Sequence, residues 1–482
     1  MFKISAVVLV IAIGLGSLFV YTQRQAVPAE LDYQKWWGTG ERPIKEDHTI
    51  RPFQININDE LINDLKQRLK IRRPFRQPLE GINSEYGMNT VYLENILSYW
   101  QEKYDFKKRM EMLNTFPHYK TRIQGLDIHY IRVKPDVGDD VDVLPILILH
   151  GWPSSSKEFD KILPILTRKK NGYHFVFEVI APDLPGFGFS EGTNKPGLNP
   201  VQIGIVMRNL MLRLGFAKFY VQAGDWGSQC ATHMATLFPD NVLGLHTNMP
   251  LSSRPISTFK LLFGSLFPSI VDYTHGQRIY PLKNFFSYIL RESGYFHLQA
   301  TKPDTIGVAL TESPAGLAAY LMEKIAICSN RDQLDTPHGG LDNLDIDDVL
   351  DTVTINWMNN CIVTSMRIYA EAFRWPEVNV VYCMGYLIPT EVPTAAIKFK
   401  YEVVYQPDWI LRDKFPNLVR STTLDFGGHF AALQTPEVLA DDIFASVAAF
   451  LSAKTYQCGV AFHHSNNDYN WKAQEHATHE YP

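Results

Sequence analysis

Three short apolar runs mark the chain, each of strand length and each ended by turn residues: 144–149, 175–181 and 219–223. Runs that are apolar throughout predict strands buried on both faces. Apolar residues at helical spacing follow the second and third runs, over 201–214 and 228–238. This alternation predicts an α/β fold whose mostly parallel sheet is covered by helices on both sides, with functional groups at the carboxyl ends of its strands.

The N-terminus carries a longer apolar run. No charged residue occurs between positions 4 and 21, and Lys3 and Arg24 bracket the run. About 18 residues, rising about 1.5 Å each, just cross a hydrocarbon core of about 30 Å. A cleaved signal peptide is the alternative, but large residues at 18–20 stand where small ones precede a cut. We therefore expect a single-pass membrane anchor, whose flanking positive residues favour neither orientation.

Patterns on either side of the strand runs suggest further parts. Helical spacing recurs over 58–69 and 90–104, and a helical, aromatic-rich stretch over 251–374 indicates an inserted cap. Strand-like residues return at 378–387, and an amphipathic helix is expected over 436–451. We divide the chain into membrane anchor, linker with wrapping segment, first core part, helical cap, second core part and polar tail: 1–24, 25–105, 106–250, 251–375, 376–454 and 455–482.

Charge and cysteine content exclude several classes of function. The 482 residues have a formal net charge of −5 and no cluster of basic residues, which argues against nucleic acid as a partner. The five cysteines lie far apart without a C-x-x-C pair, so neither a disulfide framework nor a zinc site is indicated. Reduced thiols are expected.

The turn after the third run has the pattern of a nucleophile elbow. Ala223-Gly224-Asp225-Trp226-Gly227 places small residues two before and two after Asp225, as a sharp strand-turn-helix bend requires. A carboxylate nucleophile attacks an sp³ carbon and leaves an ester that water must cleave. Alternatively, Asp225 merely caps a helix that begins near Ser228, but capping does not demand small neighbours. We favour the nucleophile.

A histidine and two backbone amides complete this chemistry. His429 lies in a glycine-flanked loop before the last predicted helix, in the chain order expected for a general base that activates water. The oxyanion formed by that water is expected to meet the backbone amides of Trp226 and of Trp152, in the loop after the first strand. Other histidines lack such a context and are interpreted as surface or core residues: His118, His174, His463, His464, His476 and His479.

Through these motifs the chain resembles the microsomal-type epoxide hydrolases, and among them the juvenile hormone epoxide hydrolases of insects. The resemblance extends over most of the chain and implies an α/β-hydrolase fold with a cap and an N-terminal wrapping segment. It also implies hydrolysis of lipophilic epoxides to vicinal diols, in juvenile hormone degradation or detoxification. The matching stretches are the anchor, Trp36-Trp37-Gly38, Ile50-Arg51-Pro52-Phe53, His150-Gly151-Trp152-Pro153, the elbow, Arg291-Glu292-Ser293-Gly294-Tyr295, Lys302-Pro303-Asp304 and Gly427-Gly428-His429-Phe430-Ala431-Ala432.

The resemblance assigns three more residues. It makes Tyr295 and Tyr369 the proton donors to the epoxide oxygen, a role that neutral phenols can fill. Ordinary packing in the cap is the alternative for both tyrosines. The resemblance also makes Glu402 the carboxylate that orients His429. The competing carboxylates for that position are Glu391, Asp408 and Asp425.

Two other functions remain to be distinguished. A haloalkane dehalogenase also uses an aspartate nucleophile, but a halide leaves without a proton and needs no tyrosine pair. A non-catalytic, membrane-tethered binding protein could lose Asp225 or His429 freely, whereas the whole constellation is present. The expected partners are a small lipophilic epoxide, water and the membrane, and the chemistry calls for no metal or organic cofactor. Microsomal-type relatives imply the endoplasmic reticulum membrane, and the lack of N-x-S/T sites favours a cytosolic catalytic domain.

Overall fold

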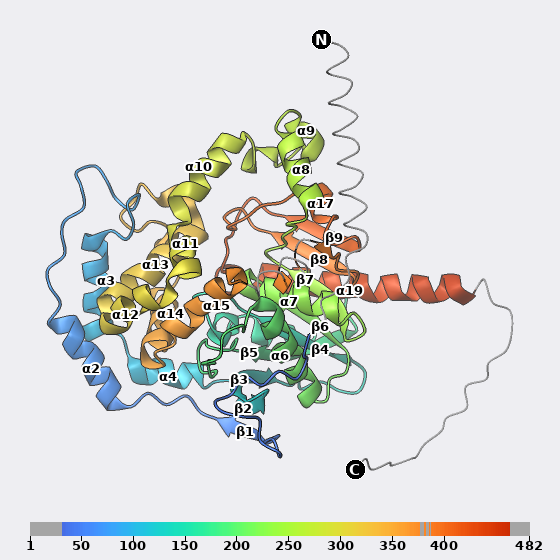
Figure 1. Ribbon diagram of the computed structural model, residues 1–482, viewed down its shortest axis with the longest axis horizontal. Coiled ribbons are helices and arrows are strands. Elements are labelled where there is room, and N and C mark those ends of the chain that lie inside the picture. Colours follow the sequence, from blue (N-terminus) through green and yellow to red (C-terminus); the bar gives the residue numbers. More distant parts are fainter. Residues whose placement is uncertain (1–30, 376–379, 382–384, 386, 463–482) are drawn as a thin grey trace, which may run out of the picture.

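A computed structural model describes residues 31–375, 380–381, 385 and 387–462 of the protein. They contain a nine-stranded sheet with helices on both faces, in the order β1-β2-β3-β5-β4-β6-β7-β8-β9 (Figure 1). The expected anchor at 1–24 lies outside these residues, and none of the helices within them has the length and apolarity to cross a membrane. The strands are β1 Ile50–Phe53, β2 His118–Ile123, β3 Leu126–Val133, β4 Asp142–Leu149, β5 Phe175–Pro182, β6 Phe219–Ala223, β7 Val242–Thr247, β8 Thr394–Lys398 and β9 Leu418–Thr423.

The sheet is mixed. From β5 through β4, β6, β7 and β8 to β9, each strand pairs with the next in parallel, as the apolar runs predicted. The strands β1, β2 and β3 add an antiparallel edge that joins β5. This edge was not predicted, because β2 and β3 mix charged and apolar residues instead of forming an apolar run.

Two hydrophobic cores lie on opposite faces of the sheet, because successive side chains of a strand point to opposite sides. On β4, Leu147 and Leu149 belong to the core that includes α6 and α7. Ile146 and Ile148 belong to the other core, with α5 and α19. These helices are α5 Leu163–Leu166, α6 Pro200–Arg213, α7 Asp225–Leu237 and α19 Pro436–Phe462.

The strand predicted at 378–387 is wrong for those of its residues that the structure describes. Within 378–387, Val380 and Val381 are helical, and the sheet resumes only at β8. Both valines pack beside Val201 of α6 and Ile388, so their apolar character serves packing between elements and not strand pairing. The last helix, α19, also runs past Lys454, where the polar tail was expected to begin.

A helical insertion separates β7 from β8. In Figure 1 its helices α11 to α15 gather beside α2 and α3 of the N-terminal segment. It comprises α8 Pro255–Gly264, α9 Pro268–Val271, α10 Leu282–Glu292, α11 Gly294–Thr301, α12 Pro303–Glu312, α13 Pro314–Asn330, α14 Ile346–Met358 and α15 Ile362–Phe373, with the 3-10 turns η2 Gly276–Arg278, η3 Arg331–Gln333 and η4 Leu341–Asn343. Two short helices follow β8, namely α17 Asp408–Leu411 and α18 Ala431–Gln434.

The N-terminal segment forms three helices that contact the insertion: α2 Asp59–Lys70, α3 Thr90–Glu102 and α4 Phe106–Leu113. Each begins at an Asn or Asp whose side chain accepts a backbone N–H, as at Asn58, whose Oδ1 lies 2.8 Å from the Leu61 nitrogen. The indole of Trp100 donates to Thr354 Oγ1 of α14 at 3.0 Å. The segment is therefore joined to the insertion by specific polar contacts as well as by apolar packing.

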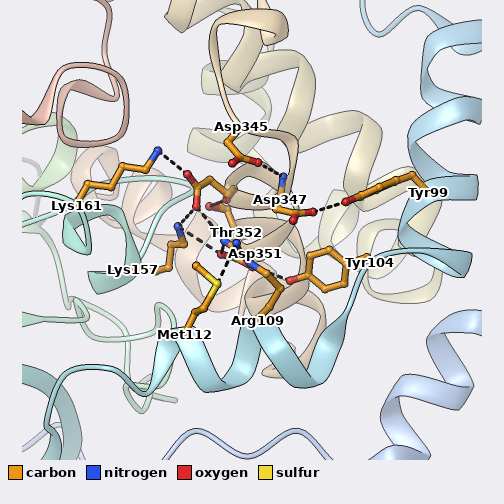
Figure 2. A network of polar contacts seen from close by, with 11 residues as sticks. Tyr99, Tyr104, Arg109, Met112, Lys157, Lys161, Asp345, Asp347, Asp351 and Thr352 are labelled. Atoms are coloured by element: carbon orange, nitrogen blue, oxygen red, sulfur yellow. Dashed lines mark hydrogen bonds and ion pairs between the residues drawn. The ribbon is translucent and has the colours of Figure 1, made fainter.

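A buried polar network joins three parts of the fold (Figure 2). Arg109 of α4 donates to both Asp348 and Asp351 of α14. Lys157, in the 3-10 turn η1 Ser156–Phe159 after β4, lies 2.7 Å from Asp348 and 3.4 Å from Asp351. The Tyr104 hydroxyl also donates to Asp351, at 2.7 Å. The network thus fixes the loop after β4 against both the N-terminal segment and the insertion.

Candidate active site

Asp225 is the first residue of α7, reached by a sharp turn after β6 ends at Ala223. Its φ is +48°, a left-handed conformation that a residue with a side chain adopts only where its surroundings enforce it. Gly224 is the N-cap of the helix, so the capping interpretation of Asp225 is wrong. A Cβ on Gly227 would lie 2.4 Å from the His150 carbonyl oxygen, which explains the small residue there. The turn presents the Asp225 carboxylate at the carboxyl end of the parallel strands.

Two backbone amides hold that carboxylate. The Trp152 N–H donates to Asp225 Oδ1 at 2.7 Å, and the Trp226 N–H also hydrogen-bonds the side chain. A Cβ on Gly151 would lie 2.1 Å from Asp225 Oδ1, so only glycine lets the loop approach so closely. Burial raises the pKa of Asp225, although the two amides and the charge of His429 oppose the rise. Both amides predicted for the oxyanion are therefore at the nucleophile candidate.

His429 lies between two carboxylates. Its Nδ1 is 2.5 Å from Glu402 Oε1, and its Nε2 is 3.5 Å from Asp225 Oδ2. A backbone bridge between Tyr401 and Gly428 brings the loops after β8 and β9 together, which explains how residues far apart in sequence meet. Burial lowers the pKa of His429, but the charge and hydrogen bond of Glu402 and the charge of Asp225 outweigh it and raise that pKa to about 9.

The competing carboxylates lie elsewhere. Asp408 pairs with Lys398 at 2.6 Å. The side chain of Asp425 is 83% exposed, and Glu391 is exposed. Among the four candidates weighed from the sequence, the structure therefore places Glu402 alone at the His429 ring.

Two tyrosines from the insertion reach the same place. Tyr295 of α11 stacks on Trp152, with ring centroids 5.6 Å apart, and Tyr369 of α15 meets Trp226 edge to face at 4.8 Å. The two phenol rings lie 6.1 Å apart and are joined by a side-chain hydrogen bond. Burial, with the negative charge of Asp225 among the further causes, raises the pKa of both phenols well above the ordinary value. Both are protonated at neutral pH and can donate.

A small cavity of about 10 Å³ adjoins Asp225, His429 and Trp152, which is about the space that one water molecule needs. Glu158 of η1 also lines it, although no sequence motif pointed to this residue. The only signal in the sequence is that a carboxylate follows shortly after the oxyanion loop. That signal is weak, because Lys157-Glu158 resembles any exposed pair of charged residues. Within the part of the chain that the structure describes, no group of three or more His, Cys, Asp or Glu side chains could hold a metal ion.

Comparisons with known proteins agree with this geometry. The model of the epoxide hydrolase N terminus matches residues 50–159, and that of the alpha/beta hydrolase fold matches residues 145–279. The chain is 73% identical to juvenile hormone epoxide hydrolase of Manduca sexta over 94% of this chain and 97% of that protein. It is 43% identical to epoxide hydrolase 1 of Sus scrofa over 85% of this chain and 91% of that protein. The crystal structure of juvenile hormone epoxide hydrolase from the silkworm Bombyx mori superposes with a TM-score of 0.86, at 43% identity over 88% and 100% of the two chains.

The mixed sheet, the strained Asp225 turn and the histidine loop define an α/β hydrolase whose nucleophile position holds an aspartate. Within that class the chain belongs to the epoxide hydrolase family, in its microsomal-type branch. It hydrolyses epoxides to diols through the covalent aspartyl ester that is general for this family.

Proposed function

We propose that Asp225 forms the ester, that His429 with Glu402 activates the hydrolytic water, and that Tyr295 and Tyr369 protonate the epoxide oxygen. The observation that carries this proposal is the Asp225 carboxylate, which accepts the Trp152 and Trp226 amides and also faces His429. The two tyrosines stand over it on helices of the insertion.

In the first step, the Asp225 oxygen that does not bind Trp152 attacks an epoxide carbon, and the carbon–oxygen bond of the ring breaks. Tyr295 or Tyr369 gives its proton to the departing oxygen, because an alkoxide is a far stronger base than a phenolate. The indole rings of Trp152 and Trp226 flank both phenols and exclude water from the reacting atoms.

In the second step, the charge of the site changes. While Asp225 is negative it helps to raise the pKa of His429 to about 9, so the resting imidazole is protonated at neutral pH. Ester formation removes that charge and lowers the pKa of His429, whose proton can then replace the one that the tyrosine gave away. The neutral imidazole accepts a proton from water, and the Trp152 and Trp226 amides stabilise the resulting oxyanion. Glu402 keeps the ring oriented throughout.

We propose juvenile hormone as the physiological substrate, with other lipophilic epoxides, including xenobiotic ones, as further substrates. The 73% identity to a protein named juvenile hormone epoxide hydrolase supports the first choice. The 43% identity to epoxide hydrolase 1 of Sus scrofa supports a wider range. On this proposal the insertion serves as the cap that supplies the tyrosines and closes the site over the substrate.

Single-turnover mass spectrometry with juvenile hormone and with cis-stilbene oxide tests the mechanism. We expect a substrate-mass adduct on the peptide that contains Asp225, transient in the wild type and persistent in His429→Gln. In ¹⁸O-labelled water the label should enter Asp225, because water attacks the carboxyl carbon and the original aspartate oxygen leaves with the diol. Diol formation without an adduct in either protein would show that Asp225 is not the nucleophile.

We also propose that residues 1–24 anchor the protein in the endoplasmic reticulum membrane, with the catalytic domain in the cytosol. The uncharged run at 4–21 supports the anchor. The region of α8 to α10 supports a second contact, since large apolar side chains are exposed there, including Phe259, Leu266, Ile270 and Leu290. Alkaline extraction of microsomes should retain the full chain and release a variant without residues 1–24, and protease added to sealed microsomes should digest the catalytic domain.

A further inference from the structure

The turn η1 sends two neighbouring charged side chains to different places. Lys157 enters the buried network of Figure 2, where it pairs with Asp348 and Asp351. Glu158, the next residue, instead lines the small cavity at Asp225 and His429. Because Lys157 is fixed by buried ion pairs, the backbone that carries Glu158 is fixed as well. Glu158 is thus held beside the cavity of Asp225 and His429 by the same contacts that join the core to the insertion.

The cavity suits a single polar molecule. Its volume of about 10 Å³ is close to the least that a water molecule needs, and a buried water needs two to four polar partners. Glu158, His429 and Asp225 supply such partners from three separate elements. Another polar side chain on the wall, Asn248, already accepts from Gln222 at 3.0 Å. Glu158 and His429 thus both border, together with Asp225, the one cavity that could hold such a water.

The electrostatics of Glu158 suit a group that exchanges a proton near neutral pH. Burial raises its pKa to about 7, while a hydrogen bond from Ser154 and the charge of His429 lower it. The negative charges of Asp225 and Glu402 also face it and act to raise that pKa. A carboxyl with a pKa near the working pH can both accept and return a proton.

We propose that Glu158 is a catalytic residue of ester hydrolysis, which binds the attacking water together with His429 and takes up the second proton of that water. The inference rests on the proposed aspartyl ester at Asp225. Water gives its first proton to His429, and its oxygen bonds to the Asp225 carboxyl carbon. The bond from that carbon to the substrate oxygen then breaks, and the substrate oxygen takes the proton from His429.

Besides binding the water, Glu158 takes up the proton that ester hydrolysis leaves over. Ester hydrolysis by one water leaves the second water proton on the new Asp225 carboxyl group. Glu158 accepts that proton and passes it to the now neutral His429. This restores the negative Asp225 and the positive His429 of the resting enzyme, so no external acid, base or cofactor is required.

Single-turnover kinetics of full-length Glu158→Gln test the inference, with juvenile hormone or cis-stilbene oxide and with ester and diol followed by mass spectrometry. We expect ester formation within about twofold of the wild-type rate, because a charged hydrogen bond to water is lost only in the second step. Ester hydrolysis should slow on the order of 10- to 100-fold. The wild-type hydrolysis rate should rise through neutral pH more steeply than that of the variant, which keeps the titration of His429 but lacks that of Glu158.

Asp160→Asn is the matched control. Asp160 follows η1, and burial also raises its pKa to about 7, but it does not line the cavity. The Asp160→Asn variant should leave the ratio of the ester formation rate to the ester hydrolysis rate unchanged. Equal slowing of both steps in Glu158→Gln, or hydrolysis within twofold of wild type, would overturn the inference.

A second variant covers the case in which Glu158→Gln does not fold. Ser154→Ala removes a hydrogen-bonding partner of Glu158 and keeps the carboxyl group. It should slow ester hydrolysis severalfold and leave ester formation unchanged, and an unchanged hydrolysis rate would count against Glu158. Absence of any ester in the wild type would overturn the proposed function, and this inference with it.

Discussion

Asp351→Asn removes one negative charge from the buried network that joins α4, η1 and α14. Asp351 is 1% exposed and accepts from the Tyr104 hydroxyl and from Arg109 Nε, at 2.7 and 2.9 Å. Lys157 Nζ lies 3.4 Å away. After the substitution, Arg109 and Lys157 keep their ion pairs with Asp348 but lose those with Asp351. The substitution should therefore lower the free energy of unfolding of the whole fold and alter the position of η1.

The size of the effect follows from desolvation. Breaking a buried ion pair by removing one partner costs about 3–5 kcal/mol, because the remaining charge stays buried. Asparagine still offers one oxygen as an acceptor, so we expect about 3 kcal/mol. That is a large share of a typical folding free energy of about 5–15 kcal/mol.

The measurement is urea unfolding of the full-length protein in detergent, followed by tryptophan fluorescence. The control is Asp304→Asn, whose carboxylate forms a two-point contact with Arg367 at 2.9 and 3.0 Å but is 64% exposed. Exposed pairs contribute about 0–1 kcal/mol, so the control should barely change the midpoint. Equal midpoints for Asp351→Asn and the control would refute the view that this network holds the three parts together.

Four further variants test the site. Tyr295→Phe and Tyr369→Phe should each slow ester formation on the order of 10- to 1000-fold, because each removes one hydrogen-bond donor to a developing oxyanion. Neither should change ester hydrolysis, and equal effects on both steps would contradict the assignment. Glu402→Gln should lower the pKa of His429 from about 9 toward 6.5, because a negative neighbour no longer favours the imidazolium, and histidine NMR titration checks this. Gly151→Ala should abolish turnover while circular dichroism stays unchanged, since its Cβ would meet Asp225 Oδ1 at 2.1 Å.

Patterns that depend on neighbouring residues were predictable from the sequence. The run at 219–223 matches β6 residue for residue, because a strand buried on both faces is mostly apolar, here with Gln222 as its one polar residue. The Asp225 elbow was predictable for a steric reason, since a side chain at Gly227 would meet backbone atoms of Leu149 and His150. His429 stood out through its glycine-rich loop and its place before the last helix. Glu402 and the two tyrosines came from family resemblance, because nothing local distinguishes them from other glutamates and tyrosines.

The same local logic failed where distant residues decide the structure. Val380 and Val381 have strand-forming side chains, yet they are helical and pack near Val201 of α6. The antiparallel edge of β1 to β3 was missed because its strands are stabilised by pairing across the sheet more than by an apolar pattern of their own.

By itself the sequence determined the strand–helix alternation, the nucleophile turn and the histidine loop, because each leaves a recognisable pattern within a few consecutive residues. Only the tertiary structure decided which carboxylates lie beside His429 and Asp225. Lys157 and Glu158 are adjacent in sequence, yet one is neutralised in a buried ion network and the other lines the reacting centre. Burial and the charges brought near by folding set the ionisation of such groups, and neither exists until distant segments of the chain meet.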